Sequence, residues 1–320
     1  MVELLWQVFR EAESSGDVKL IVLKGAGDRA FCAGGDIRVL AEESKKGNYA
    51  YPHRFFGEEY RLDCFIHHLK KPCLALINGI TMGGGVGLAI GCKYRVATES
   101  TTFAMPETAI GFFPDVGGSY FLSRLPDGVG NYLALMGARL GAPDVLHCNI
   151  ATHFVPKAKL AKLEEELCKT DFGAVAVDSV LSTYASQPEG QIEVVEHEAS
   201  IQRYFHVASA EEIYERLQEE KDKNAWAETA HKILHKKSPT SVKKGRAMSI
   251  DEVFEMDLRV ACRFMESHDF IEGVNAVIIE KHHNPHWKPS HHEEVSEDVV
   301  SSFFVPFTTA SRELWAHHQS

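Results

Sequence analysis

Short apolar runs alternate with helical patterns along the first half of the chain. Short, mostly apolar runs are typical of buried strands, and they predict strands at residues 18–23, 73–77 and 94–97. Apolar residues at helical spacing predict helices at residues 3–13 and 53–70. Because the two kinds of signal alternate up to about residue 155, we predict an α/β core whose sheet is built from βα units.

The second half of the chain has a mainly helical pattern. We predict helices at residues 161–170, 174–185, 210–220, 239–249 and 251–267. The chain is therefore divided into an α/β core over residues 1–160 and a helical C-terminal region over residues 161–320 that packs on the core.

Two glycine-rich corners follow predicted strands. Glycines 83–85 lie between the strand at 73–77 and a predicted helix, and Gly34-Gly35 precedes Asp36, which is placed to cap the next helix. Amides at a helix start attract negative charge, so two such corners can direct two N–H groups at one oxygen. The alternative interpretation is a pair of tight turns. The phosphate-loop motif G-x-x-x-x-G-K-[ST] is absent.

Three acidic residues stand out against apolar surroundings. Glu59 falls on the apolar stripe of the helix at 53–70, where a carboxylate is costly unless it is paired, protonated or facing a cavity. Glu107 and Asp115 each follow a proline in an otherwise apolar loop, and proline fixes the local backbone. The alternatives are a Glu59 side chain that reaches water, a helix cap at Glu107 and a turn residue at Asp115.

Composition excludes several classes of protein. A net charge of -11 over 320 residues argues against a general nucleic-acid surface. No C-x-x-C pair occurs among the seven cysteines, so we expect a reducing compartment rather than a disulfide framework or zinc site. No apolar run has the length of a membrane span, and no targeting segment is visible at the N-terminus. The histidine-rich stretch 282–292 contains prolines and favours a surface loop over a metal site.

Taken together, these motifs resemble the crotonase, or enoyl-CoA hydratase/isomerase, superfamily, and within it the thioester hydrolases of valine breakdown. Four long motifs in the same order carry the resemblance: Phe31-Cys-Ala-Gly-Gly-Asp-Ile37, Gly79-Ile-Thr-Met-Gly-Gly-Gly-Val-Gly87, Phe103-Ala-Met-Pro-Glu-Thr-Ala-Ile-Gly111 and Phe113-Pro-Asp-Val-Gly-Gly118. The similarity continues through Trp287-Lys-Pro289 and covers nearly the whole chain.

The resemblance implies a ββα superhelix and an enzyme that cleaves 3-hydroxyisobutyryl-CoA, and 3-hydroxypropionyl-CoA, to the free hydroxy acid and coenzyme A. By match to the family's motifs, the Gly35 and Gly84 amides form the oxyanion hole and Glu107 is the catalytic carboxylate. Asp115 is a further catalytic acid, and Glu59 lines the acyl pocket with Gly84, Glu107 and Asp115. No metal or separate cofactor is implied, since coenzyme A belongs to the substrate.

Two departures from the superfamily pattern affect these expectations. Hydratases carry a glutamate where this chain has Gly87, which favours the hydrolase over a hydratase or isomerase; a non-catalytic scaffold is the other alternative. The strand pair that usually precedes the helix at 3–13 is expected to be missing, which puts part of the coenzyme A wall in question. The resemblance also implies a mitochondrial location and a small-molecule acyl-CoA partner. It leaves a homo-oligomer open and implies neither nucleic acid nor a membrane.

Overall fold

The computed structural model describes residues 1–172, 175–242 and 248–307, and these form two compact units. Unit 1 consists of residues 1–34, 62–104 and 139–196, and unit 2 of residues 35–61, 105–138 and 197–320. Each unit thus draws on three separate stretches of the chain. The boundary near residue 160 stays a prediction.

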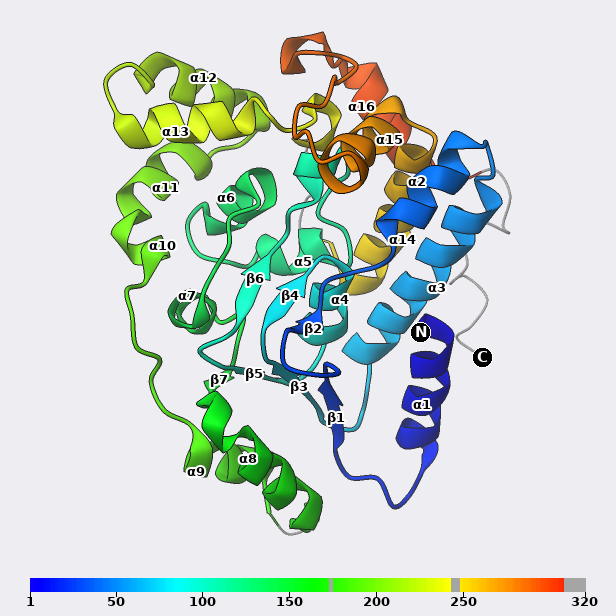
Figure 1. Ribbon diagram of the computed structural model, residues 1–320, viewed down its shortest axis with the longest axis vertical. Coiled ribbons are helices and arrows are strands. Elements are labelled where there is room, and N and C mark those ends of the chain that lie inside the picture. Colours follow the sequence, from blue (N-terminus) through cyan, green and yellow to red (C-terminus); the bar gives the residue numbers. More distant parts are fainter. Residues whose placement is uncertain (173–174, 243–247, 308–320) are drawn as a thin grey trace. The chain divides into compact units, whose positions relative to one another are not determined.

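Unit 1 contains all seven strands of the described chain, and they form two parallel sheets (Figure 1). The first sheet has the order β1-β3-β5-β7 and the second the order β2-β4-β6, with parallel pairing throughout. Parallel strands joined by crossovers require helical connections, which confirms the predicted α/β class. The strands are β1 (Ile21–Lys24), β2 (Ala30–Cys32), β3 (Cys73–Ile77), β4 (Ile80–Met82), β5 (Tyr94–Ala97), β6 (Thr102–Ala104) and β7 (His153–Phe154).

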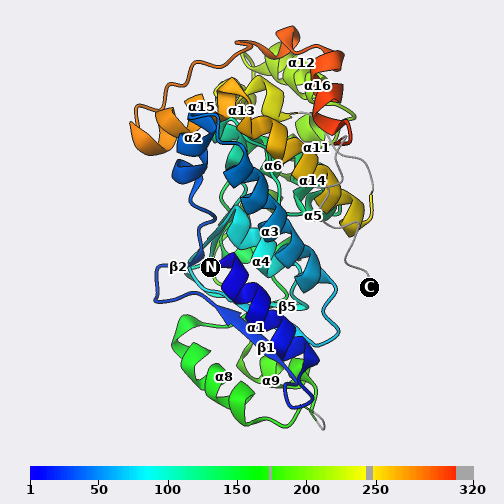
Figure 2. The same cartoon turned by 90° about the vertical axis from the view of Figure 1, so that its right-hand side faces the viewer.

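Helices cover the sheets of unit 1. Leucines and valines of α8 and α9 pack against Leu74 and Leu76 of β3 and Val96 of β5, forming one buried cluster. Figure 2 shows α1 beside α3, where Trp6 and Phe65 have ring centroids 5.1 Å apart. The helices of this unit are α1 (Val2–Ser14), α4 (Gly84–Ile90), α7 (Ala142–His147), α8 (Lys157–Lys169), α9 (Val177–Tyr184) and α10 (Glu193–Glu196), with the last part of α3.

Unit 2 is helical throughout its described residues. Its α-helices are α2 (Ile37–Lys45), most of α3 (Ala50–His67), α5 (Gly118–Leu122), α6 (Val129–Met136), α11 (Glu198–Phe205), α12 (Ala210–Glu220), α13 (Ala225–Leu234), α14 (Ile250–Met265), α15 (His268–Val274) and α16 (Glu297–Phe304). The 3-10 helices η1 (Glu107–Ile110), η2 (Pro239–Val242) and η4 (His292–Glu294) and the π-helix η3 (Asn275–Ile279) complete it.

An aromatic cluster forms the centre of unit 2. Phe112 stacks on Phe56 at 5.4 Å and contacts Phe264 and Phe270 at 5.5 and 5.6 Å between ring centroids. These rings come from α3, α14, α15 and the segment that follows η1. The cluster therefore fixes the loop that leads from Phe112 to the predicted acid Asp115.

The observed elements correct several predictions. The predicted helix at 239–249 is a short 3-10 helix at Pro239–Val242, and residues 243–247 lie outside the described part. A strand, β4, lies between the Asn78-Gly79 turn and the glycine triplet, where the sequence predicted a direct entry into a helix. The stretch 282–292 is mostly an irregular surface segment, as predicted, although Trp287 within it is buried.

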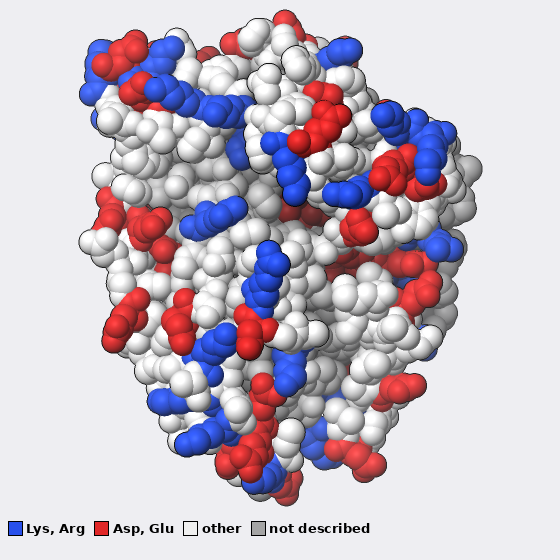
Figure 3. Space-filling view, viewed as in Figure 1, with Lys and Arg blue, Asp and Glu red and all other residues white. Residues whose placement is uncertain are grey.

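The surface of the molecule mixes charges of both signs. Figure 3 shows Lys and Arg side chains interspersed with Asp and Glu over the face that it presents. Several pairs on unit 2 are ion pairs, such as Arg216 with Glu212 at 2.6 Å. Among the described helices, none combines the length and apolar character that crossing a bilayer requires.

Candidate active site

Four carboxylates are buried in unit 2. Glu59, Glu107, Asp115 and Asp257 expose 9%, 6%, 4% and 0% of their surface. Burial disfavours the charged form of a carboxylate, so a cluster of this kind costs free energy unless it serves another purpose. The cluster includes all three acids that the sequence singles out.

Glu107 opens the 3-10 helix η1 directly after Pro106. Its Oε2 atom is buried and finds no hydrogen-bond partner among the described residues. Burial raises the pKa of Glu107 well above its usual value, and the nearby Asp115 charge raises it further. Lys237 acts in the opposite direction. An unpaired buried carboxylate oxygen is therefore available to an incoming group.

Asp115 sits in a loop whose backbone is strained. The residue that follows, Val116, has φ +50°, which is rare for a β-branched side chain. Asp257 of α14 holds this turn because its Oδ2 accepts a hydrogen bond from the Gly117 amide at 2.9 Å. Strain of this kind persists only where the surroundings enforce it, and it is concentrated at functional sites.

Tyr60 and Glu59, neighbours on α3, both act on Asp115. The Tyr60 hydroxyl donates a hydrogen bond to Asp115 Oδ2 at 2.5 Å. Burial raises the pKa of Asp115 to about 7, while the Tyr60 bond lowers it. Burial, together with the Asp115 charge, raises the pKa of Glu59 to about 8. Glu59 is thus buried beside Asp115, and its side chain does not reach water.

A buried cation, Lys237, also belongs to this cluster. Its exposed fraction is 8%, and burial lowers the pKa of its ammonium to about 8, against the opposing effect of Glu107. The unit therefore places groups that titrate near neutrality around Glu107. Groups of this kind are suited to general acid–base or nucleophilic chemistry.

The first glycine corner lies at the boundary of the two units. Asp36 caps α2 by accepting a hydrogen bond from the Val39 amide at 3.4 Å, as predicted. Gly35 precedes this cap, so its amide is not used by the helix. A methyl group on Gly35 would lie 2.6 Å from Cζ of Phe55, so glycine is required unless that ring moves.

The second glycine corner belongs to unit 1. Gly83 has φ +52° and precedes Gly84, the first residue of α4, whose amide has no acceptor within that helix. A methyl group on Gly34 would lie 3.4 Å from the Gly84 nitrogen. A methyl group on Gly85 would lie 2.1 Å from the carbonyl oxygen of Cys32. Glycine thus permits close packing of β2 against the start of α4.

The structure brings together the predicted acids and adds three residues that the sequence analysis missed. Asp115 acts electrostatically on both Glu59 and Glu107. The additions are Tyr60, Lys237 and Asp257. Asp257 carried a usable signal, because it lies on the apolar face of α14, as Glu59 does on α3. In the sequence nothing distinguishes Lys237 from Lys236.

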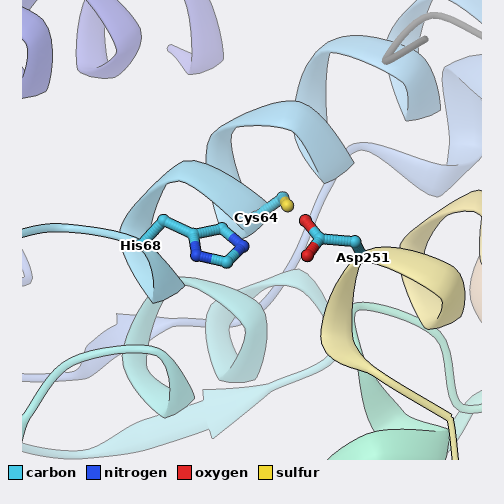
Figure 4. Close-up of side chains that lie close together, drawn as sticks. All are labelled: Cys64, His68 and Asp251. Atoms are coloured by element: carbon cyan, nitrogen blue, oxygen red, sulfur yellow. The ribbon is translucent and has the colours of Figure 1, made fainter. Parts of the chain in front are cut away.

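Cys64 and His68 are potential metal ligands one turn apart at the end of α3 (Figure 4). Asp251, also drawn there, lies in the acidic first turn of α14 in unit 2. A structural zinc site uses four ligands, and one cysteine with one histidine on a single helix falls short of that number. The expectation that no metal is needed stays a prediction.

Comparison with known proteins identifies relatives over most of the chain. The family described as enoyl-CoA hydratase/isomerase matches residues 1–304. The mitochondrial 3-hydroxyisobutyryl-CoA hydrolase of Gallus gallus is 44% identical over 318 residues, which are 96% of this chain and 82% of that protein. The enzyme of the same name from Homo sapiens is 43% identical over 316 residues, 95% of this chain and 81% of that one.

Solved structures of the same fold confirm the predicted crotonase architecture. A carnitinyl-CoA dehydratase from Mycobacterium thermoresistibile has a TM-score of 0.87 and 31% identity, covering 96% of this chain and 89% of its own. An enoyl-CoA hydratase from Rhodobacter sphaeroides has a TM-score of 0.86 and 33% identity, covering 98% and 90%. This chain therefore belongs to the enoyl-CoA hydratase/isomerase family.

Proposed function

We propose that this protein is a thioester hydrolase that cleaves 3-hydroxyisobutyryl-CoA to coenzyme A and the free hydroxy acid. The observation that carries the proposal is the buried Glu107, whose Oε2 lacks a hydrogen-bond partner among the described residues and lies within the influence of Asp115. Curated relatives that are 43–44% identical are named for this reaction, which places the proposed activity in valine breakdown.

Glu107 is the proposed catalytic carboxylate. Either it attacks the thioester carbonyl, giving a mixed anhydride that water opens, or it activates water as a general base. Both routes need the ionised form at the start. The raised pKa values of Asp115 and Glu59 then have a use, since a protonated carboxyl at either position can donate a hydrogen bond to the substrate hydroxyl.

The proposed oxyanion hole consists of the amides of Gly35 and Gly84. Attack on a thioester carbonyl places negative charge on its oxygen, and two fixed N–H groups stabilise that charge without reorganising. Loss of one such donor typically raises the barrier by about 3 kcal/mol. The position of Gly84 at the start of α4 and that of Gly35 before the Asp36 cap support this role.

Hydration of an enoyl-CoA is the second candidate, because the two solved structures above carry hydratase or dehydratase titles. By resemblance, hydratases use a second glutamate at the position of Gly87 here. Gly87 lies in α4, is buried and offers no carboxylate. This difference favours the hydrolase.

The location and partners follow from the same comparison. Because the relatives are named mitochondrial, we propose a mitochondrial location, with the acyl-CoA thioester as the small-molecule partner. We propose no cofactor besides the coenzyme A of the substrate. 3-Hydroxypropionyl-CoA, which lacks only the α-methyl group, is the proposed second substrate.

A paired assay tests the function. The purified chain is offered a panel of short acyl-CoA esters, and release of free thiol is measured beside loss of enoyl absorbance. We expect thiol release, fastest with 3-hydroxyisobutyryl-CoA and without change in enoyl absorbance for crotonyl-CoA. Enoyl loss without thiol release would instead identify a hydratase.

A further inference from the structure

We propose that Lys237 is a positioning residue for Glu107, whose buried ammonium group keeps the Glu107 carboxylate in the ionised form that thioester cleavage requires. This inference rests on the proposed function. It concerns a residue outside the acids and glycines that the family motifs single out.

Hydrogen bonds fix the backbone on both sides of Lys237. The Ser238 amide donates to the carbonyl oxygen of Thr108 at 3.2 Å, and Thr108 directly follows Glu107. The Trp287 indole donates to the carbonyl oxygen of Lys236 at 3.2 Å. Residues 236–238 are therefore held against the 3-10 helix that carries Glu107.

Asp269 strengthens this attachment. Its Oδ2 accepts a hydrogen bond from the Ser238 hydroxyl at 2.6 Å, and its Oδ1 accepts one from the Lys288 amide at 2.8 Å. A methyl group on Gly111, which ends η1, would lie 2.1 Å from the Asp269 carbonyl oxygen. Asp269 is thus packed against the end of η1 while its side chain holds the segment that contains Lys237.

The Lys237 ammonium occupies the space beside the Met105-Pro106 peptide. A methyl group on Gly137 would lie 3.4 Å from Lys237 Nζ, 3.2 Å from Pro106 Cα and 3.4 Å from the Met105 carbonyl oxygen. The ammonium and the peptide that leads into Glu107 therefore border the same small space. Gly137, which ends α6 with φ +62°, leaves that space open.

The charges around this pair are mostly acidic. Glu107 faces Lys237, and Asp115 faces Glu107. Glu59, Tyr60 and Asp257 surround Asp115, while Asp269 and its partner His268, at 3.2 Å, lie beyond Ser238. Lys237 is the cation that opposes this group at Glu107.

The ammonium of Lys237 is not committed elsewhere. Within the described ranges, no carboxylate lies in ion-pair range of Nζ and no atom accepts a hydrogen bond from it. A buried ammonium without a direct partner is costly, and burial lowers its pKa to about 8 while Glu107 raises it. The two charges therefore favour each other's ionised forms, which is the linkage that the proposal needs.

The test compares pH profiles of kcat/KM for wild-type protein and Lys237→Met between pH 5 and 9.5. The acidic limb of kcat/KM reports ionisation of the free enzyme. Loss of a neighbouring cation raises a carboxyl pKa by roughly 1 unit or more, so this limb should move upward and kcat/KM at pH 6 should fall about tenfold. Above about pH 8 the profiles should converge, because Lys237 is then neutral in both proteins.

Lys236→Met is the matched control, since Lys236 is adjacent and exposed. It should leave the profile unchanged. Lys237→Arg keeps the charge and should keep the acidic limb near its wild-type position. Lys237→Gln is a second neutral variant, with melting temperature and circular dichroism checking the fold of each protein.

Three results would overturn the inference. The acidic limb could stay in place without the charge, activity could fall by the same factor at every pH as a packing defect predicts, or Lys237→Arg could shift the limb as far as Lys237→Met. If wild-type protein releases no thiol from any ester, the proposed function fails instead, and the two failures are thus distinguishable.

Discussion

At the scale of single residues, the site depends on how burial and neighbouring groups set the charge of Asp115. The Tyr60 hydroxyl favours its ionised form, whereas burial favours the protonated form. A pKa of about 7 lets small changes alter its protonation at physiological pH. Asp115 therefore suits a role that alternates between accepting and donating a hydrogen bond.

Asp115→Asn should lower turnover of 3-hydroxyisobutyryl-CoA by roughly 10²- to 10⁴-fold, the usual contribution of a positioned acid or base. Asparagine retains the size of the side chain but cannot exchange a proton. The measurement is kcat by thiol release. Unchanged kcat with an altered preference among acyl groups would assign Asp115 to substrate recognition.

Tyr60→Phe should raise the pKa of Asp115, because the hydroxyl that stabilises its ionised form is lost. At pH 8 the variant should also lose about 1.5–3 kcal/mol of stability, the usual contribution of a hydrogen bond to a charged group. Denaturant unfolding and the pH profile of kcat/KM measure the two effects.

Tyr94→Phe is the control for Tyr60→Phe. It removes a hydroxyl that donates to Asp178 at 2.8 Å in unit 1, so it should leave the kcat/KM profile unchanged. Equal effects of both substitutions on the profile would argue against a specific link between Tyr60 and Asp115.

At the scale of elements, the glycine corner of unit 1 depends on direct packing of a helix start against a strand. Gly85→Ala would place a methyl group 2.1 Å from the carbonyl oxygen of Cys32. Because this neighbour is backbone, β2 or α4 must shift, and we expect a loss of about 1–3 kcal/mol or more. Chemical denaturation measures the loss.

Gly16→Ala is the matched substitution for Gly85→Ala, since a methyl group there meets nothing within 4 Å. Its effect should be within about 0.5 kcal/mol. Similar losses for both variants would contradict the packing argument.

The elements also show how far sequence reasoning reached. The strands at 73–77 and 94–97 were predicted at their observed bounds, since continuous apolar runs give a clear signal. β4 was missed because it has only three residues between glycine turns. The helices at Glu198–Phe205 and Ala225–Leu234 were also missed.

The candidate site was predicted in part, for physical reasons that differ between residues. An acid on an apolar stripe or after a proline is visible in one sequence, which is why Glu59, Glu107 and Asp115 were selected. Tyr60 and Lys237 depend on contacts between segments far apart in the chain. Tyr60 meets a residue 55 positions away, and one sequence carries no signal for such a contact.

At the scale of the whole molecule, the buried acids should make stability depend on pH. In the folded protein the pKa of Glu59 is about 8 and that of Asp115 about 7, against ordinary values of 4.5 and 3.8. Between about pH 4 and 8 the folded state therefore binds more protons than the unfolded state. Their contribution to stability is present at low pH and is lost as pH rises through the folded pKa values.

Glu59→Gln should weaken this pH dependence, because glutamine does not titrate. Relative to wild type, the variant should gain stability between pH 5 and pH 8 on the order of 1.4 kcal/mol for each pKa unit of the lost shift. Denaturant titrations at both pH values measure it. Glu58→Gln, which removes the neighbouring acid that pairs with Arg54 at 3.6 Å, is the control and should keep the wild-type dependence.

The most direct test of the account is the rate of thiol release from 3-hydroxyisobutyryl-CoA by Glu107→Gln. The substitution keeps the shape of the side chain and removes its charge. We predict that turnover falls by at least about 10²- to 10⁴-fold, while binding of coenzyme A and the melting temperature stay close to those of wild type. Thiol release at an ordinary rate by a folded Glu107→Gln protein would contradict the central role of this carboxylate.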